Sequence, residues 1–405
     1  MKEENSRLRV GIIGGGIGGL SLAHGLIQDG FSVMIFEQNT VASDTGGYRL
    51  HLTEKSLEAL RRLLPPNLSA AIESSAAPPE TFEHLAIFDR RAHCRARLLM
   101  PEEHRLLIGR KPLRELLSQG LDKVIRWNTR VKQVRENGQS VTITTESGDH
   151  EVFDIVVGAD GTKSVVTQAL LGRPASKPSG VSAIAGKIFL NKHPNIKPPV
   201  ALEKGLGLAI GPKGVGMFLA LHIPRTNDIA PGAILEEPYL VWAVIAEDTS
   251  FSATVTEMNK ELMREESIRM IEPWASFYKN VIEKTKTDTL GAFNFVFPGA
   301  MMPWPQSRLT LIGDAVHPMP PTAEAGASTA IVDALNMVDH LRSDPWPKAL
   351  EEYRDHMLEY APEAVDLARP ALVWQARLAN PILRWITLNL GLPVVDIGLR
   401  LFNRK

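Results

Sequence analysis

The chain has 405 residues, of which 44% are hydrophobic and 22% are charged, as is typical of a globular protein with two joined domains. Lysine and arginine (45) balance aspartate and glutamate (46), so the net charge of −1 gives no electrostatic case for nucleic acid or an anionic membrane as a partner. The single cysteine, Cys94, excludes an intramolecular disulfide and a cysteine zinc site, and the eleven histidines show no metal-binding spacing.

The N-terminal stretch, residues 8–37, predicts a strand, a glycine-rich turn, a helix and a second strand that ends at Glu37. Gly14, Gly16 and Gly19 fit G-x-G-x-x-G in the structural context that a dinucleotide-binding motif requires. The helix N-terminus favours a pyrophosphate, and a carboxylate at Glu37 can accept hydrogen bonds from a ribose. The predicted contact residues are Gly14, Gly15, Gly16, Ile17, Gly18, Gly19 and Glu37.

A structural glycine turn and a solvated Glu37 are the alternatives, and at this point the motif does not separate FAD from NAD. The charged N-terminus, MKEENSR, leads directly into the first strand. It does not have the pattern of a signal peptide, and we expect a cytoplasmic protein.

Further elements follow in order. We expect a helix over residues 56–64, a hairpin over 82–100, a helix over 113–119 and a second hairpin over 141–153 with its turn at 147–149. Residues 154–161 read as a strand buried on both faces. From residue 180 the pattern becomes β-rich, with a helix at 258–271, and residues 308–314 form a third core strand that ends in Gly-Asp.

The tail, residues 378–402, is apolar but interrupted by Pro381 and Pro393, and it contains Arg384, Asp396 and Arg400. No stretch reaches the length that spans a bilayer. We expect a packed or surface amphipathic helix, with peripheral membrane contact as the alternative.

Three motifs therefore occur in fixed order: residues 14–19, Gly-Ala-Asp-Gly at 158–161 and Gly-Asp-Ala-Val-His-Pro at 313–318. Together they resemble the group A flavoprotein monooxygenases, the family of p-hydroxybenzoate and salicylate hydroxylases, over residues 8 to about 342. The resemblance implies FAD as the bound cofactor and NADPH or NADH as a transient co-substrate. A single G-x-G-x-x-G agrees with one tightly bound dinucleotide.

The resemblance also implies the fold: α/β, with a Rossmann-like FAD-binding domain, an interleaved mainly β substrate domain (p-hydroxybenzoate hydroxylase-like) and a C-terminal helical segment. We assign residues 1–80, 101–178 and 298–342 to the FAD-binding domain. Residues 81–100 and 179–297 form the expected substrate domain, and 343–405 the C-terminal segment.

Further cofactor contacts follow from the resemblance. Asp314 ends a parallel strand, where ligands bind in open α/β sheets, and its carboxylate can hold a ribityl hydroxyl. The other expected contacts are Gly47, Arg49, Arg110, Asp160, Gly161, Gly313, Pro321, Gly326 and Ala327. Each of these residues has an alternative role. Asp314 could cap the next turn, and Asp160 and Gly161 could simply form the turn at the end of their strand. Arg110 could be a solvated arginine at the start of a helix.

Two positions depart from the family pattern. The usual Gly-Gln-Gly with a following Asn reads Glu324-Ala325-Gly326 with Ser328, and Thr167 stands where an arginine often follows the second motif. Glu324 is either a base or a solvated loop residue, and we favour the solvated residue. Thr167 leaves the choice between NADPH and NADH open.

The family often has an arginine near residues 185–187, so Lys187, together with His222, is our candidate for catalysis on a phenol or enol. An apolar lid must exclude water from the flavin. The candidates to line it are Phe189, Met217, Phe218, Leu219, Trp242, Phe293, Phe295 and Phe297.

The predicted function is an FAD-dependent monooxygenase that uses NAD(P)H and O2 to hydroxylate or epoxidise an aromatic, indolic or polyketide-like small molecule, in secondary metabolism or aromatic catabolism. The alternatives are a Baeyer–Villiger enzyme, oxidase or reductase of the same fold, and a non-catalytic flavin-binding protein. The expected partners are the substrate and O2, without nucleic acid or metal, in a monomer or homodimer.

Overall fold

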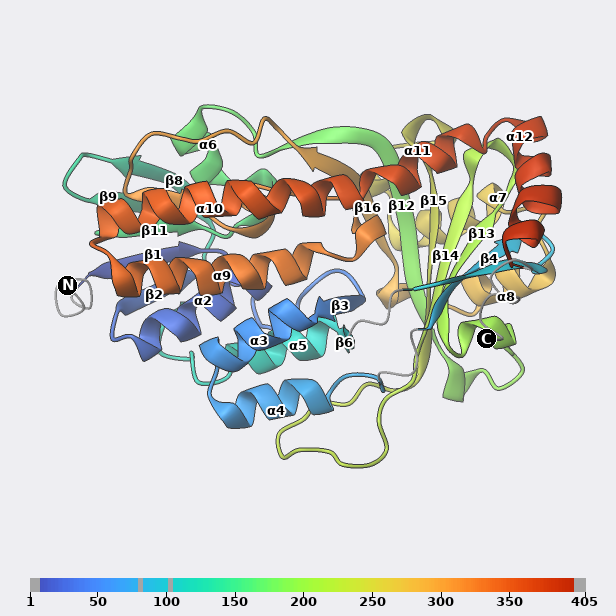
Figure 1. Cartoon of the computed structure of the whole chain (residues 1–405), viewed down its shortest axis with the longest axis horizontal. Helices are drawn as coiled ribbons and strands as arrows, with labels where there is room; N and C mark the ends of the chain where they lie inside the picture. The colour runs from blue at the N-terminus through green and yellow to red at the C-terminus, as the bar shows by residue number, and fades with distance from the viewer. Residues whose placement is uncertain (1–7, 79–82, 101–104, 397–405) are drawn as a thin grey trace.

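The computed structural model describes residues 8–78, 83–100 and 105–396 of the chain. They form an elongated molecule in which two lobes are each built on a β-sheet, and long helices run along one side (Figure 1). This arrangement confirms the expected fold of a Rossmann-like α/β unit, a mainly β unit and a C-terminal helical segment.

The first lobe is centred on a five-stranded sheet with the order β17-β11-β1-β2-β7, and every pair of neighbours in it is parallel. Its strands are β1 (Arg9–Ile13), β2 (Ser32–Phe36), β7 (Ile125–Arg126), β11 (Ile155–Gly158) and β17 (Leu309–Leu311). All residues of β11 and β17 are buried, as expected for strands covered on both faces. The three motifs therefore follow three neighbouring strands, β1, β11 and β17, at the same edge of the sheet.

Helices pack around this sheet. α2 (Ile17–Gln28) is the crossover between β1 and β2, and α9 (Gly326–Ser343) packs against it. α10 (Trp346–Leu367) packs against α9, and the two lie side by side across the front of the lobe (Figure 1). The remaining helices of the lobe are α3 (Glu54–Leu63), α4 (Pro66–Ser74), α5 (Arg110–Ser118) and α6 (Val165–Leu171).

Two smaller sheets complete the first lobe. β8 (Val131–Glu136), β9 (Val141–Thr145) and β10 (His150–Phe153) are antiparallel, which confirms the hairpin predicted over 141–153. β3 (Arg49–Thr53) pairs with β6 (Arg105–Gly109), a ladder that the sequence did not predict. Its register sets Arg49 opposite Gly109, directly before the start of α5.

The second lobe is a seven-stranded sheet with the order β16-β12-β15-β14-β13-β4-β5, in which the β13–β4 pair is parallel and the other pairs are antiparallel. Its strands are β4 (His84–Asp89), β5 (Cys94–Leu99), β12 (Ser176–Phe189), β13 (Gly205–Ile210), β14 (Gly216–His222), β15 (Tyr239–Glu247) and β16 (Gly291–Pro298). α7 (Lys260–Met270) and α8 (Ser276–Glu283) pack on one face, which leaves the other face toward the first lobe.

The chain ends in a helical segment that continues from α10 to the second lobe (Figure 1). It contains α11 (Arg369–Arg377), α12 (Pro381–Ile386) and a π-helical turn (Thr387–Gly391). The Gln375 amide nitrogen donates to the carbonyl oxygens of Gly214 (3.0 Å) and Ile245 (2.9 Å), which fixes α11 to the seven-stranded sheet. None of the helices in the described part of the chain combines the length and apolarity needed to cross a bilayer.

Candidate active site

The glycine loop between β1 and α2 is tightly packed at two positions and open at a third. Gly14 has a φ of +108°, and a Cβ atom there would lie 2.3 Å from the Ala159 carbonyl oxygen. A Cβ atom on Gly19 would lie 2.1 Å from the Gly14 carbonyl oxygen, so backbone packing requires both glycines. A Cβ atom on Gly16 would meet nothing within 4 Å. Because Gly16 precedes the first turn of α2, which has no side-chain cap, this open space fits an anionic group such as a pyrophosphate.

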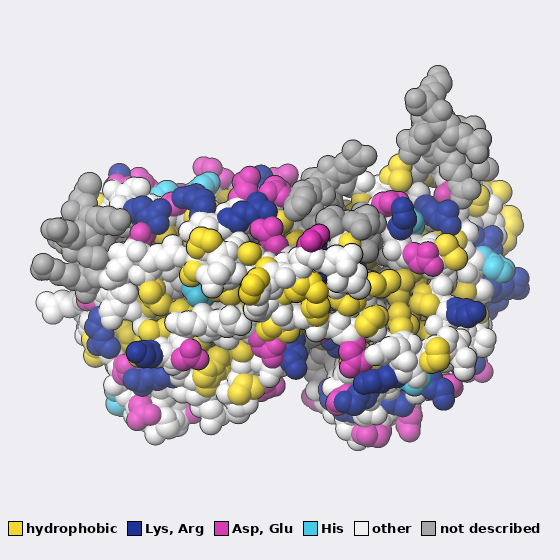
Figure 2. Space-filling view, turned by 90° about the horizontal axis from the view of Figure 1, so that it is seen from below, with side chains coloured by type: hydrophobic (Ala, Val, Ile, Leu, Met, Phe, Trp, Pro, Cys, Tyr) yellow, Lys and Arg dark blue, Asp and Glu magenta, His cyan; other side chains and the backbone are white. Residues whose placement is uncertain are grey.

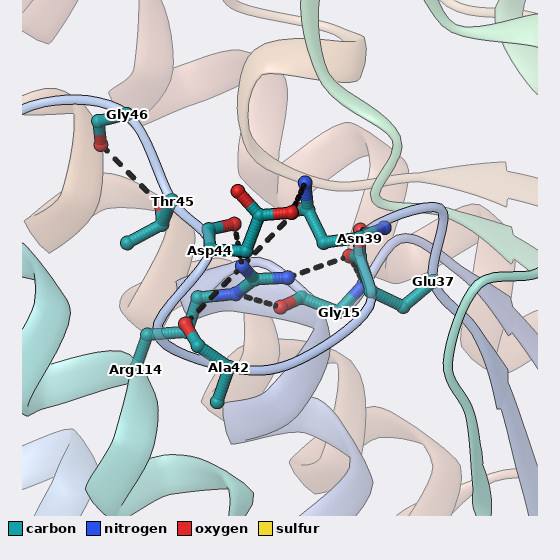
Figure 3. Close-up of polar contacts among 8 residues, drawn as sticks. All are labelled: Gly15, Glu37, Asn39, Ala42, Asp44, Thr45, Gly46 and Arg114. Carbon is teal, nitrogen blue, oxygen red and sulfur yellow. Dashed lines mark hydrogen bonds and ion pairs between the residues drawn. The ribbon is translucent and has the colours of Figure 1, made fainter. Parts of the chain in front are cut away.

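Glu37 is buried against this loop (Figure 3). Its Oε2 accepts a hydrogen bond from the Gly15 N–H at 2.7 Å, and its Oε1 accepts one from the Asn39 N–H at 2.7 Å. The guanidinium of Arg114 lies 2.9 Å from Glu37 Oε2 and also donates to the carbonyl oxygens of Gly15 (2.7 Å) and Asp44 (2.9 Å). Arg114 therefore joins the glycine loop, the end of β2 and the loop over residues 38–45.

Arg114 is a site residue that the sequence analysis missed. Its side chain is almost fully buried, and burial lowers its pKa, an effect that Glu37 opposes. Arg110, which was predicted, lies one turn earlier on the same face of α5. The sequence contained a signal for Arg114, because it follows Arg110 by four residues. Side chains at this spacing lie on the same face of a helix.

Three charged side chains of the first lobe have polar atoms that are buried and have no hydrogen-bond partner among the described residues. They are Nε and Nη2 of Arg49, Nε of Arg110 and Oδ1 of Asp160. The other oxygen of Asp160 accepts from the Val165 N–H at 2.7 Å, and burial raises the pKa of Asp160. Buried polar groups are nearly always hydrogen-bonded in folded proteins, so these atoms fit a polar ligand that binds between them.

The β3–β6 ladder brings Gly47 and Arg49 to Arg110. Gly47 has a φ of +85°, and a Cβ atom there would lie 3.1 Å from Cδ of Arg110. Arg49 Nη1 donates to the carbonyl oxygen of Leu221 in β14 at 2.6 Å. Arg49 therefore bridges the two lobes, and burial lowers its pKa, an effect that Glu324 and Tyr239 oppose.

The end of β17 contributes Gly313 and Asp314. Gly313 has a φ of +58°, while Asp314 is exposed and interacts electrostatically with Arg110. A Cβ atom on Gly326 would lie 3.9 Å from Asp314 Oδ1, so this carboxylate lies beside the start of α9. Gly161, with a φ of +77°, begins the turn after β11 at the same edge.

The loop before α9 begins with a 3-10 turn at Pro321 and continues through Glu324, whose φ is +53°. α9 then starts at Gly326 and Ala327 without a side-chain cap or an acidic residue in its first turn. Its first N–H groups are therefore available to an electron-rich ligand. Glu324 Oε2 lies 3.9 Å from His51 Nδ1 and the side chain is largely buried, so the interpretation of Glu324 as a solvated loop residue is wrong.

A buried network supports the Gly313 turn from behind. Asp333 Oδ2 accepts hydrogen bonds from the Gly313 N–H (2.8 Å) and lies 2.7 Å from His317 Nε2, while the Tyr360 hydroxyl donates to Oδ1 at 2.6 Å. Burial disfavours a charged His317, but the Asp333 carboxylate outweighs it and raises the pKa of His317. Tyr360 lies on α10, so the C-terminal helices contribute directly to this motif.

Lys187 and His222, the two candidate catalytic residues, lie in one cluster with Glu236 and Tyr239. Lys187 Nζ lies 2.9 Å from Glu236 Oε1, and the Tyr239 hydroxyl donates to Glu236 Oε2 at 3.2 Å. His222 stacks on Tyr239 with ring centroids 4.7 Å apart, and its Nε2 lies 4.0 Å from Glu236 Oε2. Burial, with smaller effects from Arg49 and Lys187, lowers the pKa of His222 to about 3, so this imidazole is neutral.

Glu236 was not predicted, and it reaches the cluster from the loop over residues 223–238, which we call the strap. The strap joins β14 to β15 and is bound to the end of α4: Ser74 accepts from the Ala230 N–H (3.1 Å) and Ser75 from the Ile234 N–H (2.8 Å). Figure 1 shows the strap extending below α4. A Cβ atom on Gly109 would lie 1.8 Å from Glu236 Oε2, so the carboxylate lies against the start of α5.

The expected lid residues divide between the two faces of the seven-stranded sheet. Met217, Leu219 and Trp242 pack with α7 and α8 on the far face, so their assignment to the pocket is wrong. The phenylalanine side chains pack on the opposite face, as strand alternation requires. They are Phe189, Phe218, Phe293, Phe295 and Phe297.

Known proteins share this sequence pattern and this architecture. Residues 7–368 match the protein family described as FAD binding domain. The chain is 30% identical over 370 residues to the 3-amino-4-hydroxybenzoate 2-monooxygenase PtmB3 of Streptomyces platensis, with 87% of this chain and 84% of that protein covered. It is 27% identical over 331 residues to the 6-hydroxynicotinate 3-monooxygenase of Pseudomonas fluorescens, with 80% of each covered.

Solved structures agree. A crystal structure from Photorhabdus luminescens, assigned as an FAD-containing monooxygenase, has a TM-score of 0.77 and 27% sequence identity. The superposition covers 91% of this chain and 98% of that one, so most of the architecture is shared.

Proposed function

This chain belongs to the FAD-binding family of group A flavoprotein monooxygenases, and from this premise we propose that it hydroxylates a small aromatic substrate with NADPH or NADH and O2. The observation that carries the proposal is the set of unpartnered buried atoms of Arg49, Arg110 and Asp160, together with the open space at Gly16. Gly16 and Asp160 follow β1 and β11, two neighbouring strands of the parallel sheet, while Arg49 and Arg110 come from β3 and from the start of α5.

We assign the pyrophosphate to Gly16 and the start of α2, and the adenosine ribose to the remaining acceptor positions of Glu37. Arg49, Arg110, Asp160 and Asp314 would hold the rest of the cofactor, with the uncapped start of α9 toward its reactive end. When bound, FAD supplies the redox chemistry that activates O2. The chain binds and orients it, and excludes water.

For the substrate we propose a ring that carries a hydroxyl group. The names of the Streptomyces platensis and Pseudomonas fluorescens relatives both specify a hydroxylated aromatic ring. In this chain Phe218 and Phe293 offer an apolar wall on the sheet face toward the first lobe, and Lys187 offers a cation. A nearby ammonium group favours the ionised form of a phenol, which is the form that an electrophilic oxygen attacks most readily.

His222 contributes as a neutral group. Because its pKa lies near 3, it does not store a proton at neutral pH, and we assign it to positioning Tyr239 and Glu236. Lys187 is the member of the cluster that we expect to touch the substrate. In the proposed domain division the whole cluster belongs to the substrate domain, and Glu236 lies against Gly109 of the proposed FAD-binding domain.

The test is to purify the protein, release and identify its flavin, and supply NADPH or NADH with a panel of hydroxybenzoates under 18O2. We expect FAD, substrate-stimulated oxidation of one nicotinamide, and a product that carries one 18O atom. A flavin-loaded protein that stimulates neither nicotinamide oxidation nor 18O incorporation with any phenol would overturn the proposal. Stimulated oxidation without 18O in the product would support a reductase instead.

A further inference from the structure

The C-terminal segment exposes an apolar stripe. Between residues 381 and 396 the large apolar side chains on the outer side recur every three or four residues, the spacing of one helix face. This stripe consists of Ile382, Trp385, Ile386, Leu390 and Val394. Ile382 is 70% exposed, Trp385 59% and Val394 68%, whereas Leu388, on the inner side, is buried. The helix therefore presents to solvent the type of face that usually packs inward.

The part of the chain before the stripe also exposes large apolar side chains. Leu367 at the end of α10 and Val373 and Trp374 in α11 are exposed, while Leu372 and Leu378 are buried against the protein. The segment is held in place by polar contacts of its inner side: besides the two Gln375 bonds, Asp396 accepts a hydrogen bond from the Arg97 N–H at 2.9 Å. The outward orientation of the stripe is thus fixed by specific contacts with the second lobe.

The charge of this region differs from that of the rest of the chain. Residues 367–405 contain six basic side chains and one acidic side chain, Asp396, in a protein whose net charge is −1. Elsewhere the two signs are mixed, as the face in Figure 2 shows. Arg377 lies over the ring of exposed Trp374, with 5.6 Å from its guanidinium carbon to the ring centroid. The exposed apolar side chains therefore belong to a part of the sequence that is rich in basic residues, of which Arg369, Arg377 and Arg384 lie in the described part.

We propose that residues 367–396 dock this protein on the surface of a bilayer that contains anionic lipids. An exposed apolar helix face with tryptophans and flanking arginines matches the properties of helices that lie in the membrane interface. The described helices do not span a bilayer, so the contact is with one leaflet. This inference goes beyond the proposed reaction and does not depend on it.

A second copy of the chain is the competing occupant, and the charge argues against it. Symmetric dimers pair the same patch of two subunits, which would bring the basic side chains of one tail against those of the other. Anionic headgroups instead complement them, and the apolar stripe reaches the acyl boundary while the arginines remain among the headgroups.

The test is flotation of the full-length, flavin-loaded protein with vesicles of phosphatidylcholine alone or with about 30% phosphatidylglycerol. We expect binding to the anionic vesicles, weaker binding in high salt, and a blue shift of tryptophan emission. The double variant Ile382→Ser/Trp385→Ser should bind at least about tenfold more weakly, because each side chain contributes apolar area. Val200→Ser, which changes an exposed valine elsewhere, is the matched control.

We expect every variant to fold, because the changed side chains are exposed. Flavin absorbance equal to that of the wild type checks this. Failure of the wild-type protein to float with anionic vesicles would overturn the proposal, as would equal binding of the double variant. Light scattering that shows a dimer in the wild type and a monomer in the double variant would also overturn it, in favour of a second copy.

Discussion

The guanidinium of Arg114 lies 2.9 Å from the carboxylate of Glu37, and both side chains are buried beside the glycine loop. A buried ion pair adds little net stability, but removal of one partner leaves an uncompensated charge in the interior. The pair also fixes the backbone of Gly15, since Glu37 accepts from its N–H and Arg114 donates to its carbonyl oxygen. Its main role is therefore to shape the loop.

Arg114→Met is expected to lower the free energy of unfolding by about 3–5 kcal/mol and to weaken FAD binding at least tenfold, by about 1.4 kcal/mol. Urea unfolding and FAD titration of the apoprotein measure the two effects. The double variant Arg114→Met/Glu37→Met should recover most of the stability but not the affinity. Arg61→Met, which breaks exposed ion pairs with Glu54 and Glu73, is the control and should cost about 1 kcal/mol or less. Normal FAD affinity in Arg114→Met would contradict the assignment.

Gly16→Ala tests the space reserved for the pyrophosphate. A Cβ atom at Gly16 meets nothing in the described structure, so the variant should fold with wild-type stability and yet bind FAD at least about a hundredfold more weakly. Gly391→Ala is the matched control, because its nearest neighbour would be 3.9 Å away and it lies far along the chain. Thermal unfolding of the purified proteins measures the stability, and their flavin absorbance measures how much FAD they retain. Tight FAD binding by Gly16→Ala would exclude this loop as the phosphate site.

His222 should make stability fall in mild acid. Burial lowers its pKa from 6.5 to about 3, so below pH 6.5 the unfolded chain takes up a proton that the folded protein does not. The free energy of unfolding should therefore decrease by about 2 kcal/mol between pH 7 and pH 5 through this residue alone. In His222→Phe, which keeps the ring on Tyr239, this part of the pH dependence should vanish in urea titrations. An identical pH dependence in the two proteins would show that His222 is solvated.

Tyr360→Phe is expected to cost more than Tyr353→Phe. Tyr360 donates to the Asp333 carboxylate at 2.6 Å, whereas Tyr353 donates to the Leu311 carbonyl oxygen at 2.9 Å. Hydrogen bonds to charged groups contribute about 1.5–3 kcal/mol and neutral ones about 1 kcal/mol. Urea unfolding of the two variants gives the comparison, and a faster release of flavin from Tyr360→Phe would show that the network reaches the cofactor. Equal costs would contradict the stronger hydrogen bond that we assign to Tyr360 and Asp333.

The double variant Lys187→Met/Glu236→Gln tests catalysis apart from folding. Because both charges are removed together, stability should stay within about 1–2 kcal/mol of wild type. Product formed per nicotinamide oxidised should nevertheless drop at least tenfold, with FAD content unchanged. The control, Lys192→Met/Glu237→Gln, removes an exposed pair of the same type, 3.6 Å apart. Wild-type product yield in the first variant would remove Lys187 from the reaction.

Local motifs predicted the parts of the site that local backbone geometry determines. The glycine loop, Asp160 and Asp314 follow their strands directly, so a parallel sheet brings them together whatever the rest of the chain does. Arg114 escaped prediction although its spacing from Arg110 was a signal, whereas Glu236 escaped because it lies on a loop whose position depends on packing against α4 and α5. The alternation of side chains along a strand indicates which residues share a face of the sheet. It does not indicate which face meets the first lobe. Met217 and Trp242 were therefore wrongly assigned to the pocket.

The contact between Tyr360 and Asp333 also bears on when the protein becomes complete during synthesis. The central strand β1 emerges from the ribosome first, but β17, which pairs with β11 at the edge of the sheet, and the helix that supplies Tyr360 come much later in the chain. The nascent chain must therefore wait for nearly its whole length before the last motif is secured. We therefore expect the five-stranded sheet to remain incomplete, and FAD not to bind tightly, until most of the chain has been synthesised.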